Sequence, residues 1–178
     1  MDQPVKLVPL VCIQCGTPVP ANPDEVAWVC GQCGQGLLLD HNQGLVELKI
    51  SYSAGIPAGR SGKPFWVVEG KVMLNRETYR GDNNRESQQF WSHPRRFFIP
   101  AFACPLDTLV QFGAAYLAEP PDCREGAPAP FDPVVLTMED VRYALEFIVV
   151  GIEAGRRDLM KEVQFSFELS QPELWVLP

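Results

Sequence analysis

Four stretches of the chain have patterns typical of β-strands. The clearest is Val163–Leu169, where every second residue is apolar, which predicts a half-buried strand. The turn-forming residues 170–172 follow, so that Glu173–Leu177 is predicted to return as the second strand of a terminal hairpin. Phe65–Leu74 is rich in aromatic and β-branched residues, and Arg96–Ile99 is predicted as the strand that returns beside it after a polar stretch.

Two other stretches repeat apolar residues every three or four positions, as amphipathic helices do. The first follows Pro105, a residue suited to the first position of a helix. Its apolar stripe consists of Leu106, Leu109, Val110, Gly113 and Leu117. The second helix follows the capping residue Thr137, and its stripe consists of Val141, Leu145, Ile148 and Ile152. Residues 119–133, which include five prolines, are predicted as the loop between the two helices.

The order strand, strand, helix, helix, strand, strand predicts an α+β fold, a mostly antiparallel sheet with two helices on one face. Ahead of it, residues 1–50 form a cysteine-containing module. Residues 51–64 are rich in glycine, serine and proline and are expected to be a flexible linker. The predicted organisation is therefore a small module at 1–50, a linker at 51–64 and an α+β domain at 65–178.

Four of the six cysteines form two Cys-x-x-Cys pairs, each followed by a glycine. The pairs are Cys12 with Cys15 and Cys30 with Cys33. Two intervening residues allow both thiolates of a pair to reach one ion from a tight turn, and the glycine permits the positive φ that such a turn favours. The four thiolates together predict one structural metal site with no open position for a substrate.

This module resembles the zinc-ribbon family. The resemblance rests on the two Cys-x-x-Cys-Gly motifs and on three apolar runs that match the short strands of a ribbon, Val26–Val29, Leu37–Leu39 and Leu45–Ile50. It covers about residues 5–50, under a third of the chain. It implies a rubredoxin-like ribbon fold and one structural zinc ion, but no particular function, because zinc ribbons occur in proteins of many roles. We recognise no family in the sequence beyond residue 50.

Two alternatives to zinc remain at this point. Rubredoxins hold iron with a similar pair of motifs, but their second motif usually contains a proline where this chain has Gly31. The four cysteines could also form two disulfides, which a reducing compartment would oppose. Zinc is therefore the favoured ion, and iron, with a role in electron transfer, is the alternative.

Composition and charge limit the compartment and the partners. The chain has 178 residues, of which 46% are hydrophobic, and a formal net charge of −7. No apolar signal segment precedes the first cysteine pair. The longest weakly charged run, Phe97–Ala118, is interrupted by two prolines and carries Asp107, which argues against a membrane span. We therefore expect a cytoplasmic protein with no membrane partner.

A basic belt interleaved with aromatic residues lies at residues 60–98 of the sequence. Residues 51–100 carry eight lysines and arginines against four acidic residues, and aromatic residues are interleaved with them. Such a composition occurs at protein interfaces and on surfaces that stack nucleic-acid bases. The candidate partner-binding residues are Trp66, Arg76, Arg80, Trp91, Arg95 and Arg96. The alternative is that the aromatic residues are core and that the arginines pair with acidic residues of 101–178.

The sequence contains no recognisable catalytic constellation. His93 and Cys104 suggest a Cys–His pair, but Cys104 lies in an apolar run, where a thiol is usually inert. We therefore expect a non-enzymatic zinc-ribbon protein that binds a protein or peptide. A nucleic-acid-binding protein is the second hypothesis, which the negative net charge disfavours. A rubredoxin-like electron carrier or an unrecognised enzyme is the third.

Overall fold

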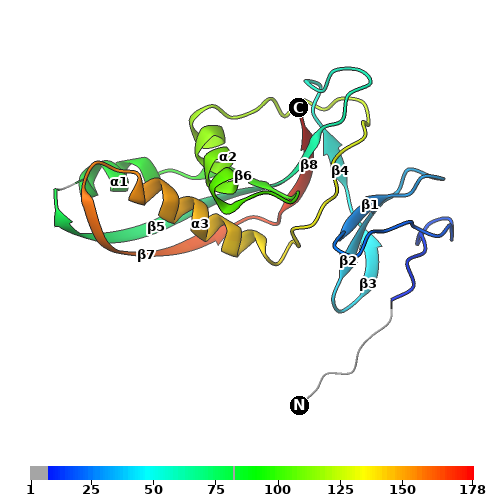
Figure 1. Cartoon of the computed structure of the whole chain (residues 1–178), viewed down its shortest axis with the longest axis horizontal. Coiled ribbons are helices and arrows are strands. Elements are labelled where there is room, and N and C mark those ends of the chain that lie inside the picture. Colours follow the sequence, from blue (N-terminus) through cyan, green and yellow to red (C-terminus); the bar gives the residue numbers. More distant parts are fainter. Residues whose placement is uncertain (1–7, 82) are drawn as a thin grey trace, which may run out of the picture.

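A computed structural model describes residues 8–81 and 83–178 (Figure 1). Its N-terminal part is a three-stranded antiparallel sheet in the order β1 (Ala27–Val29), β2 (Gly36–Asp40) and β3 (Gly44–Glu47). These strands overlap the three apolar runs of the sequence, and the register pairs Trp28 with Leu37. The third strand is shorter than the predicted Leu45–Ile50, because it ends at Glu47 and Ile50 pairs within the second sheet. Around the three strands the chain forms the ribbon, by which we mean residues 8–50.

A second sheet of five strands is built around one long strand, β5 (Lys63–Arg80). β6 (Arg95–Pro100) pairs antiparallel with the first half of β5 on one side. On the other side, β8 (Glu173–Leu177) pairs with the start of β5, and β7 (Leu159–Leu169) pairs with the remainder. β4 (Ile50–Tyr52) pairs with β8 in parallel and completes the order β4-β8-β5-β6.

The predicted terminal hairpin is wrong. β7 and β8 follow one another along the same side of β5, where Trp175 pairs with Phe65. Between the two strands, the backbone N–H of Ser170 donates to the carbonyl of Glu69 at 2.7 Å, and the hydroxyl of Ser170 accepts from the N–H of Glu69 at 2.9 Å. These bonds hold the chain against β5, so the segment with Pro172 interrupts a strand line and does not reverse it.

Strand β5 is longer than the predicted strand, and the polar stretch after it contains a helix. Residues 75–80 were expected in a connection, but they extend β5, with alternate side chains in solvent and Arg76 buried. Helix α1 (Asn84–Trp91) was not predicted. Only Ser87 and Trp91 of this helix are buried, so its apolar stripe is a single turn long and gives little periodic signal.

Helices α2 (Leu106–Ala118) and α3 (Val141–Ala154) lie where the apolar periodicity predicted them. They pack closely, because a Cβ added to Gly113 would lie 2.6 Å from the side chain of Ile148. No helix in the described part of the chain is long and apolar enough to span a membrane. The combination of helices with largely antiparallel sheets confirms the predicted α+β class.

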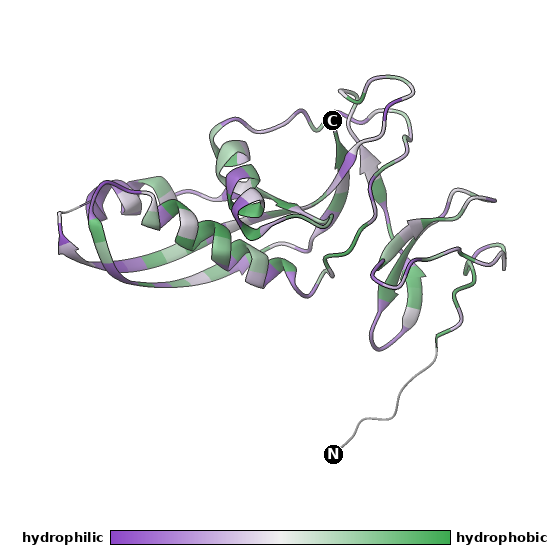
Figure 2. Ribbon diagram, viewed as in Figure 1, coloured by the Kyte–Doolittle hydropathy of each residue, from purple (hydrophilic) through white to green (hydrophobic). Residues whose placement is uncertain are grey.

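One hydrophobic core extends from the ribbon into the main sheet. It contains Ala27 and Leu38 of the ribbon together with Trp66 of β5, and hydrophobic residues are frequent in β8 and α3 (Figure 2). Val134, in the loop before α3, joins the two parts. It is fully buried, forms a β-bridge with Ala27, and accepts a hydrogen bond from the N–H of Val26 at 2.9 Å.

Residues 51–64, predicted as a flexible linker, are instead held at both ends. The segment begins inside β4 and ends inside β5. Between these strands, the N–H of Ser53 donates to the carbonyl of Val176 at 2.9 Å, and its hydroxyl donates to the carbonyl of Asp122 at 2.7 Å. The serine and glycine residues that suggested flexibility instead form part of the parallel strand β4 and of the hydrogen-bonded turn that follows it.

Candidate metal centre

The first cysteine pair lies in a tight turn that begins at Cys12. The N–H of Cys12 donates to the carbonyl of Thr17, and the N–H of Gly16 donates back to the carbonyl of Cys12, both at 2.8 Å. Gly16 has a φ of 73°, in the left-handed region that favours glycine. The turn therefore presents the thiols of Cys12 and Cys15 toward the same point.

The second pair repeats this geometry. The N–H of Cys30 donates to the carbonyl of Gln35 at 2.8 Å, and the N–H of Gly34 donates to the carbonyl of Cys30 at 2.9 Å. Gly34 has a φ of 76°. The role that the sequence predicted for the two glycines is therefore seen in both turns. β1 ends just before Cys30 and β2 begins just after this turn, so the ribbon sheet positions the second pair.

The four thiols form one cluster. The Sγ atoms of Cys12 and Cys33 are 3.6 Å apart, as are those of Cys15 and Cys30, and all four lie within 4.8 Å of one another. A tetrahedral ion with Zn–S bonds of about 2.3 Å would place its sulfur ligands about 3.8 Å apart. Disulfide sulfurs would be separated by only about 2.05 Å. The arrangement thus fits a metal ion, and the four cysteines are free of disulfides in this structure.

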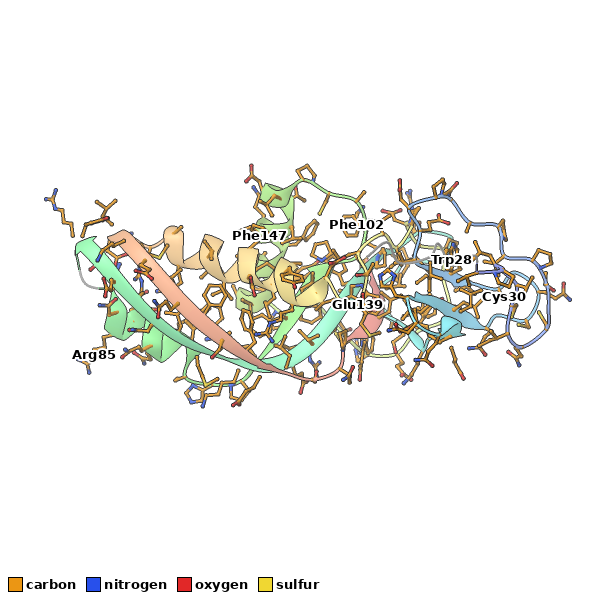
Figure 3. All side chains as sticks on the ribbon, turned by 90° about the horizontal axis from the view of Figure 1, so that it is seen from below. Trp28, Cys30, Arg85, Phe102, Glu139 and Phe147 are labelled. Atoms are coloured by element: carbon orange, nitrogen blue, oxygen red, sulfur yellow. The ribbon has the colours of Figure 1, made fainter. Side chains whose placement is uncertain are left out.

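Packing fixes one thiol of each pair. Cys12 and Cys30 are buried in a small core with Trp28 and Leu37, whereas Cys15 and Cys33 are exposed. Trp28 and Cys30 lie together in the ribbon in Figure 3. The metal centre and the apolar core of the ribbon therefore share residues, so an ion at the cysteines would also order the core around Trp28.

The thiols influence one another's ionisation. Hydrogen bonds with the hydroxyl and the N–H of Thr17 lower the pKa of Cys15 to about 6. At Cys33 a hydrogen bond with the N–H of Gln35 lowers the pKa, but partial desolvation of the thiol within the cluster and the neighbouring sulfurs outweigh it and raise the pKa to about 12. One thiol of the cluster therefore ionises readily, but ionisation of all four thiols is unfavourable. A cation at its centre would supply the charge that four thiolates require.

The donor set limits the chemistry. Among residues 8–81 and 83–178, these cysteines are the one group of three or more His, Cys, Asp or Glu side chains with metal-site geometry. Four thiolates suit zinc or iron, and they fill a tetrahedral ion completely. The cluster is therefore suited to a structural or redox ion and leaves no coordination position for a substrate.

Half of the predicted partner-binding residues are buried. Trp66 is fully buried, and its indole N–H donates to the carbonyl of Leu136 at 2.8 Å. Trp91 is 2% exposed, and its indole donates to the carboxylate of Glu153 at 2.8 Å. Arg76 is also buried and pairs with acidic residues from the C-terminal part of the chain. For these three residues the alternative interpretation is correct, namely that the aromatic residues are core and the arginine pairs with acidic residues of 101–178. The prediction that the belt forms a single binding surface is wrong.

The other three predicted arginines lie in separate environments. The guanidinium of Arg95 lies over the ring of Phe90, 3.8 Å from its centroid, and donates to the carbonyl of the same residue. Arg96 donates from Nε to Glu69 at 3.0 Å. Arg80 is exposed at the end of β5. The structure therefore does not gather the six predicted residues into one site.

The Cys–His pair suggested by the sequence is likewise not assembled. His93 is exposed, and its Nδ1 lies 2.7 Å from the hydroxyl of the neighbouring Ser92. Burial raises the pKa of Cys104 above its usual range, against an opposing effect of Lys63. A thiol with a raised pKa is a poor nucleophile.

A groove beside the cysteine cluster was not predicted. It has a volume of about 780 Å³ and lies between the ribbon and the proline-rich loop. Its lining includes Trp28 of β1, Gly31 and Gln32 of the second cysteine turn, and Phe131 with its neighbouring prolines in the loop. The five prolines of the loop were a signal in the sequence, but nothing in the pattern placed that loop against the ribbon.

The lining of the groove includes a half-buried carboxylate, that of Glu25. The carboxylate of Glu25 accepts hydrogen bonds from the N–H and the side-chain amide of Asn22, both at 2.9 Å, and from the indole of Trp28 at 2.8 Å. Burial raises the pKa of Glu25, but these bonds outweigh it and the pKa is lowered. Asp132, also in the lining, is paired with Lys63 at 2.9 Å.

The likeness of residues 8–50 to a zinc ribbon rests on four clustered cysteines and the three strands around them. No further family signal comes from the rest of the chain. Comparison of the chain with protein-family models, with curated proteins and with solved structures gave no match.

Proposed function

We propose that this protein is a zinc-stabilised interaction module that binds an extended, positively charged segment of a partner protein in the groove beside the cysteine cluster. The observation that carries the proposal is that the second cysteine turn contributes Gly31 and Gln32 to the lining of the groove. The ion would then stabilise the groove as well as the ribbon, because it would fix the position of the turn that lines the groove. The module would act by binding and would not catalyse a reaction.

The closed donor set supports a structural zinc ion. All four ligands come from the protein, and two of them are buried in the core of the ribbon. Zinc has no redox chemistry and accepts tetrahedral thiolate coordination without strain, which suits a site whose task is to hold two turns together. Iron at the same site would point to electron transfer.

The shape and lining of the groove support an extended peptide. Ligand sites commonly have volumes of about 300–1,000 Å³, and this groove falls within that range. Aromatic and proline side chains from two elements, among them Tyr52, Phe131 and Pro130, line it as they line grooves that bind extended chains. Val29, at the edge of the ribbon sheet, is 37% exposed and borders the groove.

Charge supports a basic partner segment. The ribbon has four acidic residues, Asp24, Glu25, Asp40 and Glu47, and one lysine, Lys49. Four thiolates with one Zn²⁺ would add two further negative charges next to Gln32. Complementary charge across an interface speeds encounter and discriminates between partners. We therefore expect lysine or arginine in the bound segment.

The metal is tested by elemental analysis and an absorption spectrum of reduced, untagged protein. We expect one equivalent of zinc and no visible colour. One equivalent of iron with thiolate-to-iron absorption bands would overturn the zinc assignment and favour electron transfer.

The groove is tested with a phage-displayed library of random peptides, and selected peptides are then measured by fluorescence anisotropy. We expect the peptides to be rich in lysine or arginine. Phe131→Ala and Gln32→Lys should each weaken binding roughly tenfold, the first by removing apolar contact and the second by opposing charge. Tyr79→Ala, a change at a residue 71% exposed on β5, is the matched control and should leave affinity unchanged. Peptides without basic residues, or equal affinity in all variants, would overturn the proposal.

A further inference from the structure

Helix α3 has apolar side chains on two sides. Its inner side is buried against the core through Leu145, Ile148 and Val149. Its outer side carries Tyr143 and Phe147, which are 62% and 52% exposed. Figure 3 shows Phe147 on α3, with β5 and β7 on the other side of the helix.

The exposed residues form a continuous stripe. Tyr143, Phe147, Val150 and Ala154 are spaced four, three and four positions apart, and all four are exposed. This is the spacing with which one helix packs against another. Single exposed apolar residues are ordinary on a protein surface, but a contiguous stripe with two aromatic rings is typical of an interface.

The charges at the two ends of the stripe are opposite. Glu139 and Asp140 precede the helix and are exposed, whereas Arg157 follows it and is exposed. Glu139 lies 3.2 Å from His41, and within the described residues Arg157 has no acidic group within salt-bridge distance. A second α3 running in the opposite direction would place the basic end of one helix beside the acidic end of the other. Antiparallel helices also oppose their macrodipoles favourably.

We infer that α3 pairs with α3 of a second copy of this chain, antiparallel and about a two-fold axis near Phe147. In such an isologous contact the same stripe serves both copies, so Phe147 packs on its own equivalent and Tyr143 lies near Val150 of the other copy. None of the residues lining the groove belongs to α3, so both copies keep their grooves open. The inference is independent of the proposed function.

The test is sedimentation equilibrium of the full chain from low to high micromolar concentration. We expect a reversible shift from 19.8 kDa to twice that mass. Phe147→Glu places two like charges on the axis and should raise the dimer Kd by roughly a hundredfold or more. Tyr79→Glu adds the same charge to an exposed aromatic position on β5 and should not change the Kd. Circular dichroism checks that both variants are folded.

The charge pattern gives a second measurement. Arg157→Glu should weaken the dimer several-fold, and the double change Arg157→Glu with Glu139→Lys should restore most of the affinity, because the two changed positions again carry opposite charges. A protein that stays monomeric throughout the concentration range would overturn the inference. A dimer that is unaffected by Phe147→Glu would overturn it as well, since the contact would then lie elsewhere.

Discussion

Four charged side chains meet inside the protein where β5, the end of α3 and the start of β7 come together. Arg76 donates from its two Nη atoms to the carboxylate of Asp158 at 2.9 and 2.8 Å, and its Nε lies 3.3 Å from Glu153. Arg156 donates from Nε to both oxygens of Glu153 at 2.9 Å. The side chains of Arg76, Asp158 and Glu153 are at most 2% exposed, so each charge depends on its partners for stabilisation.

Removal of Arg76 therefore leaves carboxylates buried without a full set of partners. Arg76→Met should lower the free energy of unfolding by about 3–5 kcal/mol, as measured by chemical denaturation. Arg80→Met, at an exposed position of the same strand, is the control and should change it by about 0.5 kcal/mol or less. Equal stability of the two variants would show that the buried pairing contributes little.

The same cluster makes stability depend on pH in acid. The hydrogen bonds from Arg76 are the main cause that lowers the pKa of Asp158. Burial raises the pKa of Glu153, but hydrogen bonds from Arg156 and Trp91 outweigh it, so that this pKa is lowered as well. Because both carboxylates are more acidic in the folded protein, their contribution is complete above the unfolded values of about 3.9 and 4.3. It is lost as the pH falls through the lower folded values.

This pH dependence can be measured against Asp158→Asn, which cannot ionise at that position. The difference in unfolding free energy between wild type and variant should be constant from pH 7 to about 5 and should shrink below about pH 4. Any loss of metal in acid affects both proteins and cancels in the difference. A difference that stays constant to pH 3 would contradict the assignment.

At the scale of elements, the contact between α2 and α3 depends on the absence of side chains. A Cβ on Gly113 would lie 2.6–2.7 Å from three carbon atoms of Ile148, a β-branched residue with little freedom to move. Gly113→Ala should therefore destabilise the protein by about 1–3 kcal/mol, although alanine is the better helix former by up to about 1 kcal/mol. Thermal and chemical unfolding measure the change. Gly31→Ala, with no heavy atom within 4 Å of the added group, is the control and should be near neutral.

The elements that the sequence predicted well are those with several turns or several alternations. α2 and α3 each bury one stripe over three or more turns, and β7 alternates over its length, so periodicity alone identifies them. The short helix α1 and the continuation of β5 were missed because their inward positions include polar residues. The pairing of β7 with β5, in place of β8, depends on contacts between distant parts of the chain that no local pattern contains.

The candidate sites likewise include residues that a local pattern predicted and residues whose position depends on distant parts of the chain. The cysteine cluster was predictable because both turns encode their geometry within six residues. Trp66 and Arg76 illustrate the opposite case, since both occupy even-numbered positions of β5 and are buried on one face. Alternation indicates that they share a face, but Arg76 is stable there only because Asp158 and Glu153, far along the chain, are brought to it.

At the scale of the whole molecule, the stability of the main sheet depends in part on the folded ribbon. Their shared core and the bridge through Val134 predict that loss of the ribbon weakens the rest without unfolding it. Cys30→Ser should abolish stoichiometric metal binding and lower the thermal midpoint. The helical signal in circular dichroism should largely remain, because α2, α3 and β5 keep most of their partners.

Cys104→Ser is the matched control, since this cysteine lies outside the cluster and should affect neither metal content nor the midpoint. Complete loss of the helical signal in Cys30→Ser would contradict the prediction, because it would mean that the chain folds as a single cooperative unit. An unchanged thermal midpoint would also contradict the prediction, because it would mean that the shared core does not couple the stability of the main sheet to that of the ribbon.

The position of β8 has a consequence for how this chain folds during its synthesis. β8 lies between β4 and β5, and Trp175 pairs with Phe65, a residue made 110 positions earlier. While the ribosome is still adding residues before 173, both neighbouring strands expose backbone groups that β8 will later cover. The strands of the ribbon can pair early, but the main sheet cannot be completed until residues 173–177 have emerged. A nascent chain paused before residue 173 would therefore be the form most in need of chaperones.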